Sequence, residues 1–79
     1  MQYMKVNQGL IDARVLYVLM DGKVHTQDEI AKSLDIAPEF VSTAIENLSQ
    51  DFIVHKTDVN EVYLDPKHVY YGLKPKSQK

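Results

Sequence analysis

The chain contains no cysteine, and this excludes both a disulfide framework and a metal site built on thiolates. It also lacks any apolar run near the roughly 20 residues that a membrane-spanning helix needs. The first five residues, Met1 to Lys5, do not have the basic-then-apolar order of a signal peptide. We therefore expect a protein of the cytoplasm without membrane contact.

Glycine and histidine are too scattered to build a catalytic or metal site. The three glycines are far apart, which excludes a glycine-rich phosphate loop: Gly9, Gly22 and Gly72. No two of the three histidines stand three or four positions apart, as helical metal ligands would: His25, His55 and His68. We expect His55 and His68 to be exposed or partly packed. The sequence predicts no enzyme, no metal and no cofactor.

The chain has fewer basic residues than acidic ones. Nine Lys and Arg residues face eleven Asp and Glu residues, for a net charge of −2. Lys74, Lys76 and Lys79 lie in the last six residues, so residues 1–73 hold six cations against eleven acids, a net charge of −5. Nucleic-acid binders usually have the opposite balance, because neutralising phosphates supplies much of their affinity. We expect one domain over residues 1–73 and a flexible basic tail over 74–79.

Apolar residues between Leu10 and Leu19 recur with the period of a helix that has one broad buried face. The helix is expected to stop at Met20, because the following Asp21-Gly22 favours a turn. Asp12 and Arg14 should point outward. Residues 1–8 have weak periodicity and fit an arm or a short strand, and Lys23 to His25 leave room for one strand bridge.

A capping box predicts the second helix. The Thr26 hydroxyl can accept from the backbone N–H of Glu29, whose carboxylate can reach back to Thr26. The helix should run to Leu34, with Ile30, Ala31 and Leu34 facing inward. Residues 35–37 form a break.

A third helix is expected over residues 38–50, because Pro38 suits the first helical position. Its apolar stripe is Val41, Ile45 and Leu48. Residues 52–56 and 61–64 read as two strands joined by the loop 57–60. Asp65-Pro66 then opens either a short helix through Tyr71, closed by Gly72, or a third strand.

The segment 26–37, followed by the stripe of the third helix, resembles the winged helix-turn-helix domain of small prokaryotic and viral transcription regulators. The resemblance covers roughly residues 11–64. It implies an α+β fold with a three-helix core and a two- or three-stranded β-hairpin wing. The small Ala31 would let two helices cross closely, and the Ile36 side chain would anchor the turn by packing into the core. Asp35 stands where the family usually has glycine, a position that Asp tolerates in the left-handed conformation.

The resemblance implies double-stranded DNA as the partner, with the helix 38–50 in the major groove. The outward positions of that helix are Glu39, Ser42, Thr43, Glu46, Asn47 and Gln50, and it contains no Arg or Lys. Ser42, Thr43 and Asn47 would read bases, while Gln27 and Lys56 would touch phosphates. The expected DNA-binding residues are Thr26, Gln27, Glu39, Phe40, Ser42, Thr43, Asn47, Lys56 and Lys67.

An alternative class of function is a protein interaction module that does not bind DNA. The acidic third helix and an exposed Phe40 would then dock another protein, since aromatic residues are enriched at interface centres. The alternative for Phe40 is that its ring tucks against a neighbouring helix. A homodimer through the first helix or the C-terminal segment fits either function. Two interpretations of the tyrosines remain open: a second apolar surface, or rings packed in the core with their hydroxyl groups in contact with water. The tyrosines concerned are Tyr63, Tyr70 and Tyr71. A continuous negative charge on the third helix and wing would count against DNA.

Overall fold

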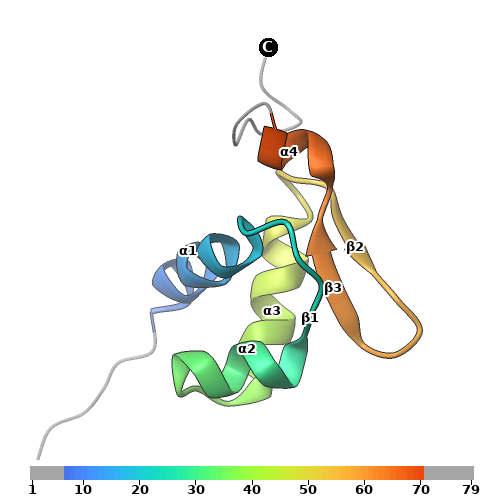
Figure 1. Ribbon diagram of the computed structural model, residues 1–79. Coiled ribbons are helices and arrows are strands. Elements are labelled where there is room, and N and C mark those ends of the chain that lie inside the picture. The colour runs from blue at the N-terminus through green and yellow to red at the C-terminus, as the bar shows by residue number, and fades with distance from the viewer. Residues whose placement is uncertain (1–6, 71–79) are drawn as a thin grey trace, which may run out of the picture.

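The structure, a computed structural model, describes residues 7–70 and is an α+β domain (Figure 1). Within that range, a helical core packs against a small antiparallel sheet. The elements in chain order are α1 (Gln8–Leu19), β1 (His25–Thr26), α2 (Gln27–Leu34), α3 (Pro38–Leu48), β2 (Val54–Lys56), β3 (Glu61–Leu64) and α4 (Pro66–Tyr70). The expected fold class, a three-helix core with a β-hairpin beside it, is confirmed.

The ends of the helices follow local side-chain chemistry. The Asn7 side chain accepts a hydrogen bond from the backbone N–H of Leu10 at 3.0 Å, so α1 begins slightly earlier than the apolar pattern predicts. The helix ends at Leu19, and the chain then turns at Gly22, whose φ of +76° is in the left-handed region. The predicted end of the first helix is confirmed.

The predicted helix-turn-helix unit is present in α2 and α3. Thr26 Oγ1 accepts from the Glu29 backbone N–H, and the Glu29 carboxylate accepts from the Thr26 N–H, both at 3.0 Å. Asp35 takes the left-handed conformation with φ 57°, and the Ile36 N–H donates to the Ala31 carbonyl. Pro38 then opens α3, as expected.

The core lies between the three long helices and one face of the sheet. α3 is central to it, because α1 and α2 both pack on its apolar side, as Figure 1 shows. Leu34 and Ile36 are half-buried at the edge of the core. The fully enclosed apolar residues are Val15, Leu19, Ile30, Ala31, Val41, Ala44, Ile45, Leu48, Val62 and Leu64.

The three strands pair in the order β1-β3-β2, with β3 in the middle. Thr26 pairs with Glu61 and Val54 with Leu64, both antiparallel. The third strand is therefore β1 near the start of the chain, and the segment after Leu64 is the short helix α4 rather than a strand. Phe52 precedes β2 because its N–H still bonds the Leu48 carbonyl at the end of α3, at 2.7 Å.

A buried histidine docks α4 onto the chain before β2. His68 is only 5% exposed, and its Nε2 accepts from the Ile53 N–H at 3.0 Å. The Phe52 ring packs edge-on against it, and the Asp65 N–H donates to the Ile53 carbonyl. The expectation that His68 is exposed or partly packed is therefore wrong. Its ring satisfies a backbone N–H that pairs with no strand.

Several expectations lie outside the described residues. They are the arm over residues 1–6, the closure of the last helix at Tyr71 and Gly72, and the basic tail 74–79. Of the expected tyrosine surface, the structure describes the Tyr63 ring, which is half-buried and stacks on His55 at a centroid distance of 4.8 Å. Between residues 7 and 70, no helix is long and apolar enough to cross a membrane.

We predict that Thr26→Ala lowers the free energy of unfolding by about 1 kcal/mol, because it removes the acceptor that caps α2. Chemical denaturation followed by circular dichroism measures the change. Ser33→Ala, an exposed substitution inside the same helix, is the control and should leave stability unchanged or slightly raised. Equal effects of the two substitutions would show that the capping box does not stabilise the domain.

The contact between His55 and Asp65 makes the free energy of unfolding depend on pH in the acidic range. The hydrogen bond from His55 to Asp65 at 2.8 Å, followed by that from the Lys67 N–H, lowers the Asp65 pKa below its ordinary value of 3.8. A lowered carboxyl pKa adds stability above the ordinary value, and this stability is lost as the pH falls through the folded pKa. We predict a flatter loss of stability between about pH 5 and pH 2 for Asp65→Asn than for wild type. Asp58→Asn, in the exposed hairpin loop, should keep the wild-type slope.

Candidate interaction surface on helix α3

One side of α3 is polar and exposed along its length. Glu39, Ser42, Thr43 and Glu46 recur at helical spacings of three, one and three, so they share the side opposite the buried Val41–Leu48 stripe. All four side chains are exposed. We call these four residues the α3 face, and they include three of the nine expected DNA-binding residues.

Both hydroxyl groups of the α3 face donate inside the protein. Ser42 Oγ donates to Gln27 Oε1 at 2.8 Å, and Thr43 Oγ1 donates to the Glu39 carbonyl at 3.1 Å. Toward a partner, the two hydroxyl groups can therefore act only as hydrogen-bond acceptors, through their oxygen lone pairs. The carboxylates of Glu39 and Glu46 offer acceptors as well. The α3 face therefore presents hydrogen-bond acceptors and negative charge.

A buried glutamine holds the α3 face against the hairpin. Gln27 is 7% exposed; its Nε2 donates to Asn60 Oδ1 at 3.1 Å while its Oε1 accepts from Ser42. Its backbone N–H also bonds the Asn60 carbonyl. The sequence suggested Gln27 as a phosphate contact, but both ends of its side-chain amide are engaged within the domain. Gln27 thus joins α2, α3 and the loop between β2 and β3.

Asn47 turns toward α1 rather than outward. Its Nδ2 donates to Asp12 Oδ2 at 3.0 Å, and Asp12 Oδ1 accepts from Gln8 Nε2 at 2.8 Å. Asn47 and Asp12 are both half-buried. The expectation that these two side chains point outward is wrong, because each satisfies a polar group of the other helix. Asn47 links α3 to α1 instead of extending the α3 face.

Phe40 and Thr26 are less available than expected. Phe40 is half-buried, so the ring does not stand out as a free aromatic anchor, and its carbonyl accepts from Gln8 Nε2 at 3.2 Å. The Thr26 hydroxyl is committed to the cap of α2.

The two expected lysine contacts lie apart. Lys56 is exposed at the end of β2, next to the hairpin loop. Lys67 is exposed in α4, which Figure 1 places at the end of the domain opposite α2. The structure thus joins Gln27 and Ser42 directly and keeps Lys67 away from the start of α3.

The charge of the described residues is strongly negative. Residues 7–70 hold eleven acids against the five cations Arg14, Lys23, Lys32, Lys56 and Lys67. From α3 to the end of β3, Lys56 is the single cation among five acids. In the same described range, no three His, Asp or Glu side chains come close enough to hold a metal ion. The surface that these residues form is acidic.

Two residues to which the sequence assigned no role hold expected site residues in place. Asn60 anchors Gln27, and Asp12 anchors Asn47. The position of Asn60 could have been anticipated from the sequence, because it ends the expected loop 57–60 and Asn is a residue type favoured in turns. In the structure it takes the left-handed conformation, with a φ of 64°. The role of Asp12 could not be anticipated in this way, because its partner is 35 positions away.

No family model, curated protein or solved structure matches the chain.

We predict that Gln27→Ala lowers the free energy of unfolding by about 1 to 2 kcal/mol, because it leaves two polar partners to water. It should also speed amide hydrogen exchange in the loop 57–60, which loses its side-chain tie to α2. Lys32→Ala, an exposed change in the same helix, is the control. Unchanged exchange in the loop would show that Gln27 does not hold the hairpin.

Proposed function

We propose that this domain binds a basic segment of another protein through the α3 face. The observation that carries the proposal is that the α3 face offers acceptors and negative charge, with both hydroxyl protons used internally. Lys and Arg side chains offer the complementary groups, N–H donors with positive charge. DNA phosphates are themselves acceptors and anions, so they do not complement this face.

The negative charge is only partly explained by helix stability. Glu39 lies in the first turn of α3, where the positive end of the helix dipole favours an acid. Glu46 lies near the other end, where an acid is unfavourable, and the last turn has no basic residue. The Glu46 carboxylate therefore gains nothing from its own helix. It is exposed and free to pair with a cation of a partner.

The hairpin extends the same acidic character. Through Gln27, the loop residue Asn60 lies close to Ser42 of the α3 face. Asp58 in this loop is exposed, and Glu61 begins β3. A basic segment lying along α3 would therefore meet further acids on the hairpin. Charge complementarity of this kind fixes orientation and speeds association.

A second candidate is a small DNA-binding transcription regulator, as the resemblance implies. The observation that favours it is the order of a capped α2, a left-handed turn residue and an exposed α3 beside a hairpin. Ser42 and Thr43 would then accept from the exocyclic amines of cytosine or adenine. Lys56 would supply a phosphate contact. This candidate depends on fold analogy, whereas the first depends on the chemistry of the surface.

One binding experiment separates the two candidates. Fluorescently labelled protein is titrated with a Lys- and Arg-rich peptide, and separately with a pool of random-sequence DNA duplexes. Anisotropy is read at roughly 50 and 200 mM salt, because phosphate contacts weaken steeply over that range. Binding of the peptide without binding of the duplexes supports the protein partner. Duplex binding that weakens with salt supports the regulator.

We predict that the double substitution Glu39→Gln and Glu46→Gln weakens peptide binding by roughly tenfold, because two exposed ion pairs are lost. The same variant should strengthen duplex binding, since it removes repulsion from phosphates. Asp28→Asn with Asp51→Asn removes equal charge from exposed positions outside the α3 face and is the matched control. Peptide affinity that falls equally in both double variants would mean that net charge, and not the α3 face, attracts the peptide.

A further inference from the structure

Helix α1 leaves one apolar side uncovered. The side chains of Leu10, Ala13, Tyr17 and Met20 recur at spacings of three, four and three, so they line one stripe. Tyr17 is 77% exposed and Leu10 is 52% exposed. A stripe of this kind on a small domain indicates a contact surface. We call these four residues the α1 stripe.

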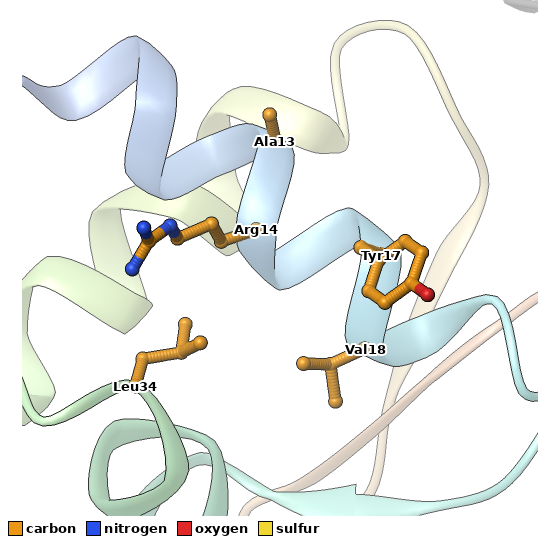
Figure 2. A pocket seen from close by; sticks show the side chains of 5 residues that line it. All are labelled: Ala13, Arg14, Tyr17, Val18 and Leu34. Carbon is orange, nitrogen blue, oxygen red and sulfur yellow. The ribbon is translucent and has the colours of Figure 1, made fainter.

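A shallow groove runs beside the α1 stripe. It lies between α1 and the end of α2, and Figure 2 shows Val18 of α1 and Leu34 on its two sides, with Arg14 extending past Leu34 and Tyr17 near Val18. Its volume is about 290 Å³, and its lining is almost entirely apolar, with Arg14 as the one charged residue along it. Tyr17, the most exposed of the large apolar side chains in the described residues, therefore stands at the edge of an apolar groove.

We propose that the α1 stripe is the contact between two copies of this chain, with their α1 helices antiparallel across a two-fold axis at Tyr17. In such a pair, a residue before Tyr17 on one helix lies opposite a residue equally far after Tyr17 on the other. The flank of the helix on which a side chain lies is preserved. At about 100° per residue, Arg14 and Asp21 share one flank of Tyr17, while Ala13 and Met20 share the other.

Each flank of the α1 stripe is complementary to itself under this symmetry. Arg14, three residues before Tyr17, meets Asp21, four residues after it, on the second copy. The Asp21 side chain is 41% exposed; it pairs with His25 at 2.9 Å within its own chain and would take Arg14 of the second copy as a further partner. Arg14 makes no ion pair within residues 7–70. On the other flank, the small Ala13 meets the long Met20. A two-fold contact repeats both matches, which is the pattern of an isologous interface.

The groove gives the tyrosine of each copy a place to bind. When Tyr17 of one copy enters the groove of the other, its ring lies against Val18 and Leu34 and under the Arg14 guanidinium. The apolar walls remove the ring from water, and the cation favours the ring face. A second copy is the occupant because the α1 stripe and the residues beside it together provide the ring, the groove, the cation and the acid. This inference does not depend on the function proposed for the α3 face.

Sedimentation velocity over protein concentrations on the order of 0.01 to 1 mM, where small interfaces associate, tests the proposal. The wild-type chain of 9.1 kDa should shift from monomer to dimer as concentration rises. Tyr17→Ala, a change at an exposed side chain, should weaken the dimer by roughly a hundredfold while the circular dichroism spectrum stays unchanged. Glu39→Gln with Glu46→Gln should leave the dimer intact.

A charge exchange between copies gives the sharper result. Arg14→Glu and Asp21→Lys should each weaken self-association by about tenfold, because each places like charges opposite one another. An equimolar mixture of the two variants should restore the dimer, since each mixed pair regains both opposite-charge contacts. Lys32→Glu makes the same charge change as Arg14→Glu on another helix, and it should have no effect. Mixing also controls for any local effect of Asp21→Lys on its bonds to Lys23 and His25.

Three results would overturn the proposal. One is a wild-type chain that stays monomeric over the whole concentration range. Another is a dimer that withstands both Tyr17→Ala and Arg14→Glu, which would place the interface elsewhere. The last is a mixture of Arg14→Glu and Asp21→Lys no more associated than either variant alone, which would exclude the antiparallel register.

Discussion

The buried side-chain amide of Gln27 is the contact on which the arrangement of this domain depends. It is a single polar group, 7% exposed, that donates to the hairpin loop and accepts from α3. Because both partners belong to other elements, the amide fixes α2, α3 and the hairpin relative to one another. The apolar core would hold these elements together without it, but hydrophobic contact has no preferred direction. The hydrogen bonds of Gln27 are directional, so they set the orientation of α2, α3 and the hairpin relative to one another.

Two surfaces with different chemistry result from this arrangement. The α3 face presents acceptors and negative charge, and the α1 stripe presents an aromatic ring and apolar side chains, with Arg14 and Asp21 beside it. They belong to different helices, and the partners that we propose for them differ as well, a cationic segment in one case and an identical helix in the other. A domain of this size can therefore bind a partner and pair with itself at the same time. In such an assembly each dimer would carry two α3 faces.

The fold was predictable where its causes are local. The capping box of Thr26, the left-handed Asp35 and the Pro38 start each depend on residues within a few positions, and all three are present. The roles of His68 and Asn47 were not predictable in the same way. Their partners, Ile53 and Asp12, are 15 and 35 positions away, and only the folded chain brings them within hydrogen-bond distance. The α3 face was predictable as polar and acidic, but the internal use of its hydroxyl protons was not.

No linker residue separates β1 of the sheet from helix α2. β1 ends at Thr26 and α2 begins at Gln27, so the residue that pairs with Glu61 in the sheet is also the cap of the helix. A hinge needs residues that can change their backbone angles, and none is left here. The pairing of β1 with β3 therefore holds the hairpin directly against the start of α2. A partner bound at the α3 face would therefore also act on the hairpin loop, because the Gln27 amide bonds both Ser42 of that face and Asn60 of the loop.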